Sequence, residues 1–130
     1  MEPFAIKHAA AAPDAAAPDG SEVRLLCATL RASMAKFTLR SGAVSKAVAH
    51  RTVEEVWYVI TGSGRMWRKS GDREEMSELA AGCSLTIPAG TQFQFRCDGA
   101  EPLEAVAVTM PRWPGEGEAY PVAGPWQATV

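Results

Sequence analysis

Beyond residue 20 the chain consists of short apolar runs that alternate with turn-forming residues. No window shows the i, i+3, i+4, i+7 apolar spacing of a helix over a helical length, although residues 73–81 allow a short helical turn. The runs instead have the length and the alternation of β-strands, and Gly, Pro, Ser and Asp separate them. The predicted strands occupy residues 23–30, 34–39, 44–50, 55–61, 65–69, 74–79, 84–87, 92–97 and 103–109.

This series of short strands predicts an all-β sandwich or barrel. A length of 130 residues allows one domain, and an apolar content of 47% is enough for its core. Residues 1–20, rich in Ala, Pro and Asp, are expected to be a flexible or extended leader, and residues 21–110 to be the barrel. Residues 111–130 contain Pro, Gly and Trp. We expect them to be an irregular tail that packs on the barrel or on a partner subunit, with Trp113 at the barrel mouth or against that subunit.

Charge and cysteine content exclude several classes of function. The chain has 13 Lys and Arg against 15 Asp and Glu, so it lacks the basic surface that nucleic acids and anionic membranes require. No apolar stretch has the length of a membrane span. The three cysteines lack the close spacing of a disulfide framework, which favours a reducing, cytoplasmic location.

Two segments hold the candidate functional residues. In residues 42–62, five residues separate Gly42 from the tripeptide that ends in His50. Four residues then separate His50 from Glu55, and six more separate Glu55 from Gly62.

The second segment, residues 82–97, has five residues between Gly82 and Pro88, and then Gly90. Together the two segments resemble the two motifs of the cupin superfamily, which are small β-barrels. The resemblance covers roughly residues 40–97 directly. It implies a single-domain double-stranded β-helix (jelly-roll) barrel, and since similar cupins are commonly dimers, it also implies a homodimer.

The resemblance bears on metal binding as well. In metal-binding cupins three His and one Glu converge inside the barrel. This chain keeps His50 and Glu55 and has Val48 and Phe93 at the other two positions. Because tight sites use at least three protein donors, no bound metal is expected, and His50 and Glu55 are the candidate ligands if a divalent ion does bind.

Strand alternation places the same residues beside a ligand. His50 shares one face of its strand with Val48, Glu55 shares a face with Trp57, and Phe93 shares a face with Phe95. The resemblance implies that these faces line the barrel interior. An imidazole and a carboxylate that face each other there form a charge-assisted hydrogen bond. The predicted ligand-binding residues are His50, Glu55, Trp57, Phe93 and Phe95.

The remaining polar and aromatic positions are expected to point elsewhere. Glu54 breaks the alternation and is predicted to face solvent. Gln92 and Gln94 are adjacent to Phe93 in the strand and therefore lie on its opposite face, so they should point away from the cavity. Tyr58 and Trp67 are expected to point outward, where exposed aromatic residues often mark an interface.

Three functions are compatible with these features. The first is a protein that binds a small organic molecule in its barrel, with His50 and Glu55 at the polar end. The second is an enzyme of isomerase, lyase or dioxygenase type, in which His50 and Glu55 hold a metal, or in which His50 is a general base held by Glu55 without a metal. The third is a non-catalytic dimeric scaffold, which predicts a cavity filled by Phe93 and Trp57.

Overall fold

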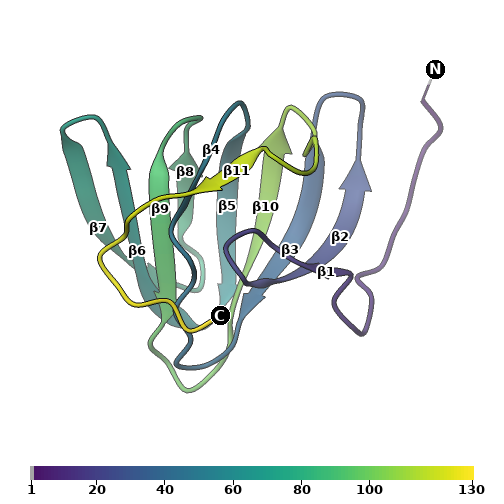
Figure 1. Ribbon diagram of the computed structural model, residues 1–130. Helices are drawn as coiled ribbons and strands as arrows, with labels where there is room; N and C mark the ends of the chain where they lie inside the picture. The colour runs from purple at the N-terminus through teal and green to yellow at the C-terminus, as the bar shows by residue number, and fades with distance from the viewer. Residues whose placement is uncertain (1) are drawn as a thin grey trace.

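The computed structural model describes residues 2–130 and contains β-strands and no helix over that range (Figure 1). No helix of residues 2–130 therefore meets the length and apolarity of a membrane span. All strand pairs are antiparallel. The strands are β1 (Ala15–Ala16), β2 (Glu22–Ala28), β3 (Ser33–Leu39), β4 (Val48–His50), β5 (Glu54–Thr61), β6 (Ser63–Ser70), β7 (Arg73–Ala80), β8 (Ser84–Ile87), β9 (Gln92–Cys97), β10 (Leu103–Met110) and β11 (Ala119–Pro121).

The all-β prediction is confirmed, and each predicted strand overlaps an observed one. The largest difference is at residues 44–50, of which only Val48–His50 form a strand. Upstream of β4 the Lys46 N–H donates to the carbonyl of Asp19 instead of continuing the ladder. Strands β1 and β11 were not predicted, because two or three residues are too short to show alternation.

The strands form two sheets, which we call sheet A (β1-β2-β3-β10-β5-β8) and sheet B (β11-β4-β9-β6-β7). In sheet A the strand register aligns inward-facing side chains in rows across β3, β10 and β5. Three successive rows are Ser33–Thr109–Glu55, Ala35–Ala107–Trp57 and Phe37–Ala105–Val59. Side-chain size along these rows determines where the interior is filled.

One end of the barrel is densely packed. Leu39 and Leu103 form the next row of sheet A, and both are buried. Met66 and Phe95 are register partners in sheet B and are also buried. These side chains belong to a single hydrophobic core. At the other end the rows begin with Ser33 and Thr109, which are too small to fill the space between the sheets.

The tail, residues 111–130, packs on sheet B of its own chain. Strand β11 pairs with β4, and the chain then crosses in front of β9 (Figure 1). The Gln94 amide donates to the carbonyls of Ser45 and Trp126, and its oxygen accepts from the Trp126 N–H. Gln94 thus lies on the opposite face of β9 from Phe93, as expected. It is nevertheless buried, because the tail covers this side of the sheet.

The outward aromatic residues differ from one another. Tyr58 is 51% exposed, as predicted. Trp67 pairs in register with Gln94 and so points to the outer side of sheet B, but it is only 4% exposed. The expectation that it is an exposed aromatic is wrong, because it lies beside the buried Gln94, and its indole N–H donates to Glu74.

The leader lies along β2. Ala15–Ala16 pair with the beginning of that strand, and Asp14 accepts a hydrogen bond from the Leu25 N–H. Met1 lies outside the described residues. The flexibility expected for residues 1–20 stays a prediction, but residues 15–19 have a defined place, because they form one wall of the interior cavity.

Candidate ligand-binding site

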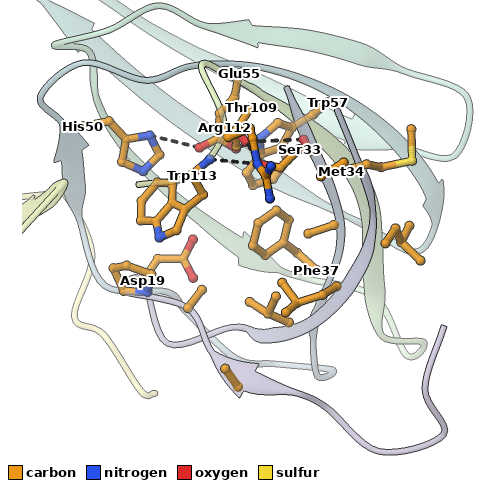
Figure 2. Close-up of a pocket in the computed structure, with 18 of the residues that line it drawn as sticks. Asp19, Ser33, Met34, Phe37, His50, Glu55, Trp57, Thr109, Arg112 and Trp113 are labelled. Atoms are coloured by element: carbon orange, nitrogen blue, oxygen red, sulfur yellow. Dashed lines mark hydrogen bonds and ion pairs between the residues drawn. The ribbon is translucent and has the colours of Figure 1, made fainter. Parts of the chain in front are cut away.

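A cavity of about 430 Å³ occupies the hollow end of the barrel. This volume lies within the usual range for sites that bind small molecules. The small side chains of Ser33, Ala35 and Thr109 leave the space open on the sheet A side. Figure 2 shows the side chains around it. They are mostly apolar, and the row Ser33–Thr109–Glu55 supplies polar groups at one end. His50, Asp19, Lys7 and Arg112 are the other charged or ionisable lining residues.

The polar end is built around Glu55, which is 4% exposed. Its Oε2 lies 2.9 Å from His50 Nδ1, and its Oε1 accepts a 2.9 Å hydrogen bond from the Trp57 indole N–H. The structure thus brings together His50 and Glu55, which four residues separate in the sequence. The hydrogen bond from Trp57 at one oxygen and the close approach of His50 at the other limit the orientation of this buried carboxylate.

The His50 ring is only partly engaged by protein. Its Nδ1 is within ion-pair distance of Glu55 Oε2 but makes no hydrogen bond. In Figure 2 a single polar contact reaches the ring, and it comes from Glu55. The second ring nitrogen, Nε2, has no hydrogen-bond partner among residues 2–130. This nitrogen is therefore available to a bound molecule.

Aromatic rings surround the polar group. Phe37 stacks on Trp57 with ring centroids 5.7 Å apart. Phe93 and Trp113 both meet the His50 ring edge-on, at 5.3 and 5.0 Å. The backbone N–H of Trp113 donates a hydrogen bond to Ser33 Oγ, which fixes the beginning of the tail beside the cavity. Such rings fix the position of apolar or planar groups.

Asp19, in the loop after β1, adds a second buried carboxyl group to the lining. Its Oδ1 accepts hydrogen bonds from the Ser21 N–H and hydroxyl, at 2.9 and 2.6 Å. Burial raises the pKa of Asp19 more than these hydrogen bonds from Ser21 lower it. The carboxyl group therefore keeps its proton to higher pH than usual and can donate a hydrogen bond to a ligand.

Four of the five predicted ligand-binding residues line the cavity: His50, Glu55, Trp57 and Phe93. Phe95 is not among the lining residues, because it lies one layer deeper, with its ring 5.1 Å from that of Trp57. Sequence reasoning missed other lining residues. Among them are Lys7, Asp19, Ser33, Phe37, Thr109 and Arg112. The signal for the space itself was present in the small residues at alternate positions, Ser33 and Ala35 in one strand and Ala107 and Thr109 in another.

Two facing antiparallel sheets that enclose a ligand-sized cavity define a double-stranded β-helix barrel. The family described as cupin domain matches residues 35–109, which is more than half of the chain. The chain belongs to the cupin family, as the two sequence motifs predicted. Comparison with curated proteins found no match.

Similar solved structures have the same fold. A conserved protein with a double-stranded β-helix domain from Klebsiella pneumoniae is 18% identical, with a TM-score of 0.66 over 80% of this chain and 85% of that one. Oxalate decarboxylase from Bacillus subtilis is 16% identical, with a TM-score of 0.77 over 94% and 33%. The capsular polysaccharide assembling protein CapF from Staphylococcus aureus is 15% identical, with a TM-score of 0.69 over 80% and 32%. The chain thus spans about a third of the last two proteins.

The residues of this cavity do not fit the metal that some cupins hold. The Bacillus subtilis oxalate decarboxylase has Mn(II) centres. Here Val48 and Phe93 are buried register partners and offer no donor atom. Both oxygens of Glu55 already contact His50 and Trp57. Within residues 2–130 no three His, Cys, Asp or Glu side chains are grouped as a metal site requires.

Proposed function

We propose that this cupin binds a small organic molecule with an apolar body and one polar end in the cavity between its sheets. The observation that carries the proposal is the cavity of about 430 Å³ with a polar group at one end of an aromatic lining. Most ligand pockets have this composition, because apolar walls supply affinity and a few polar groups fix orientation.

The lining suggests how the molecule lies. Its polar group would face His50 and Asp19, where one ring nitrogen and one carboxyl group are available. Its apolar part would pack on the stacked rings of Phe37 and Trp57. Trp113 would cover the molecule from the side of the tail.

The open volume argues against the dimeric scaffold with a filled interior. That hypothesis requires Phe93 and Trp57 to occupy the space, yet both rings lie against the wall and leave the cavity open. The metal-dependent enzyme lacks a third donor. A metal-free enzyme is the second candidate, supported by the Glu55 carboxylate behind His50 Nδ1, which is the arrangement of a general base. The cytoplasmic location stays a prediction.

The binding proposal is tested by ligand-observed NMR with a fragment library and two matched variants. Ala35→Leu places a larger side chain in the cavity, whereas Ala80→Leu makes the same change at an exposed position of β7. We expect fragments to bind the wild-type protein and Ala80→Leu equally and Ala35→Leu at least about tenfold more weakly. Equal binding to all three proteins, or no binding to any, would contradict the proposal.

His50→Ala tests the polar end separately. It should weaken fragments that carry a hydrogen-bonding group and leave purely apolar fragments unchanged, because only the former use the imidazole. If His50→Ala leaves the binding of every fragment unchanged, the assignment of His50 is wrong. For the enzyme, conversion of a bound compound by the wild-type protein that Glu55→Gln abolishes, with binding retained, would establish acid–base catalysis.

A further inference from the structure

A second cavity, of about 350 Å³, lies where the end of β6 and the beginning of β7 approach β8 and the turn that follows it. Figure 1 shows the β6–β7 turn and the β8–β9 turn at the same end of the molecule. Charged and hydroxyl side chains dominate the lining, chiefly those of Arg68, Lys69, Arg73, Glu75 and Thr91. We call this second cavity the basic pocket.

The basic pocket is separate from the barrel cavity. One row of register partners in sheet B runs through Val48, Phe93, Arg68 and Glu75. The first two residues line the barrel cavity and the last two line the basic pocket. The buried ring of Phe93 lies in this row, and no residue lines both spaces. A molecule in one space therefore leaves the other free.

Arg68 is held in a fixed position in the basic pocket. It pairs in register with Phe93, so its side chain leaves β6 on the side that faces sheet A. Nη1 donates to the carbonyl of Thr86 in β8 at 2.9 Å, and Nη2 donates to Ser77 Oγ at 3.2 Å. Nε has no hydrogen-bond partner among residues 2–130. Protein atoms therefore use only part of the donor capacity of this guanidinium group.

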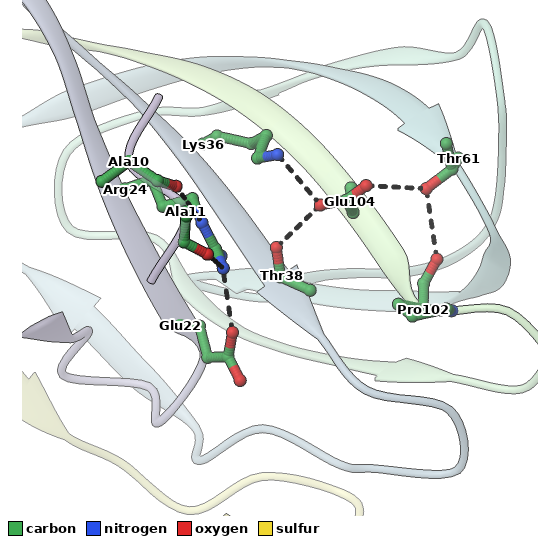
Figure 3. A network of polar contacts seen from close by, with 9 residues as sticks. All are labelled: Ala10, Ala11, Glu22, Arg24, Lys36, Thr38, Thr61, Pro102 and Glu104. Carbon is green, nitrogen blue, oxygen red and sulfur yellow. Dashed lines mark hydrogen bonds and ion pairs between the residues drawn. The ribbon is translucent and has the colours of Figure 1, made fainter. Parts of the chain in front are cut away.

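The basic pocket also holds positive charge that no carboxylate balances. The half-buried lysines and arginines of residues 2–130 are Arg24, Lys36, Arg68, Lys69 and Arg96. Those outside the pocket each lie within 3.4 Å of a carboxylate oxygen, as Figure 3 shows for Arg24 with Glu22 and for Lys36 with Glu104. The two that line the pocket have no carboxylate within ion-pair distance among the described residues.

The carboxylates opposite these two cations are engaged elsewhere. Glu75 is the register partner of Arg68, but its Oε2 lies 3.2 Å from Arg73 Nε. Glu74 is the register partner of Lys69, and it accepts a hydrogen bond from a tryptophan indole. The pocket lining therefore contains three cations and one carboxylate, which leaves two net positive charges.

Thr91 adds a buried hydroxyl group to the same lining. The residue is only 4% exposed, and its backbone N–H donates to the Pro88 carbonyl, which fixes its position in the β8–β9 turn. Its hydroxyl has no hydrogen-bond partner among residues 2–130. A buried polar group without a partner is costly, so this hydroxyl is suited to a bound molecule that supplies one.

We propose that the basic pocket binds a phosphate group, either free or as part of a small organic phosphate. Guanidinium, ammonium and hydroxyl groups are the donors that phosphate oxygens accept from. The two net positive charges match a phosphate monoester, which carries about −1.5 to −2 near pH 7. The volume is at the lower end of the range for small-molecule sites, on the order of 300–1,000 Å³, and leaves room for a short organic part.

A ¹H–¹⁵N NMR titration of the full chain at constant ionic strength tests the proposal. The probes are inorganic phosphate and glucose 6-phosphate, with glucose as the uncharged control. We expect both phosphates to shift the amide resonances of residues 68–73 and 91, with dissociation constants of about 1 mM or below, and glucose to shift none. Tighter binding of glucose 6-phosphate would assign the site to an organic phosphate, and equal binding would assign it to the phosphate group alone.

Matched variants separate the pocket from general charge attraction. Arg68→Gln should weaken the binding of both phosphates at least about tenfold, because it removes a charged donor group. Arg65→Gln makes the same change at an exposed position on the opposite face of β6 and should bind like the wild-type protein. Should Arg68→Gln not fold, as judged by circular dichroism, Lys69→Gln replaces it. Ala35→Leu fills the barrel cavity and should leave phosphate binding unchanged.

Three results would overturn the proposal. The first is the absence of shifts with either phosphate at about 20 mM, far above the expected dissociation constant. The second is equal weakening by Arg65→Gln and by the pocket variant, which would indicate attraction to the whole surface. The third is loss of phosphate binding in Ala35→Leu, which would place the phosphate in the barrel cavity.

Discussion

The two ends of the barrel are made by the same strands and differ in the size of their inward side chains. At the packed end β3 and β10 contribute Leu39 and Leu103, whereas at the hollow end they contribute Ser33 and Thr109. The backbone ladder is continuous between the two ends. A change of residue size along two strands is therefore enough to divide the interior into a packed core and an open cavity, the proposed binding site.

The difference also separates stability from binding. Buried side chains at the packed end contact each other on all sides, so their removal leaves a void. Side chains at the hollow end already face open space, so their removal enlarges a cavity that exists. Substitutions at the two ends should therefore differ in which property they change.

The largest effect on stability is expected from Phe95→Ala at the packed end. This ring is buried against Trp57, and its removal should lower the free energy of unfolding by about 4 kcal/mol. Urea denaturation followed by fluorescence measures the change. A loss below about 1 kcal/mol would show that this end can collapse and that the two ends do not differ.

Glu55→Gln should have a smaller effect, of about 2 kcal/mol. The amide oxygen can still accept the hydrogen bond from Trp57, but the partner of His50 loses its charge. The imidazole Nδ1 resonance in a ¹⁵N NMR spectrum should shift with the loss of this pairing. An unchanged resonance would mean that His50 and Glu55 do not interact in solution.

Phe37→Ala should cost only about 1 kcal/mol in stability, because the ring is half-buried and borders the open cavity. Fragment affinity should nevertheless fall about tenfold, because the aromatic wall is lost. Thermal unfolding and NMR titration of the same sample give the two values. A large loss of stability with unchanged affinity would reverse the distinction between the ends.

The smallest effect is a pH dependence at Asp19. Burial raises its pKa in the folded protein above the ordinary 3.8, so the folded state binds the proton more tightly than the unfolded state does. The contribution of this group to stability therefore falls as the pH rises from 3.8 towards the raised value. In Asp19→Asn the amide oxygen can still accept the hydrogen bonds from Ser21, and the stability of this variant should not decrease over that pH range. Parallel stability–pH curves for the two proteins would contradict the assignment.

Much of the fold and half of the site could be predicted from the sequence. Strand alternation and turn residues are local signals, so the strands and the residues that share a strand face could be predicted from them. That the faces of His50, Glu55 and Trp57 line the interior was implied by the resemblance to cupins. The resemblance also implied that His50 and Glu55 meet inside the barrel, and the structure places them on facing strands of the two sheets, β4 and β5.

The remainder depends on contacts between distant segments. Asp19 reaches the cavity only because the leader turns back beside β2, and its Ala-Pro-Asp context reads as an ordinary turn. Gln94 and Trp67 are buried by packing outside the barrel, which no strand pattern reports. Phe95 points into the barrel as predicted but lies too deep to reach the cavity. Alternation along a strand gives the direction of a side chain and not its depth in the barrel.

A crystal structure of the wild-type protein grown with its tightest-binding fragment tests the central claim most directly. The account predicts that the fragment lies in the cavity, with the stacked Phe37 and Trp57 rings on one side of it and the His50 imidazole on the other. Its polar group should point towards Asp19 or His50 Nε2. A fragment bound outside the barrel, or an interior closed by inward rotation of Trp113 and Phe93, would contradict it.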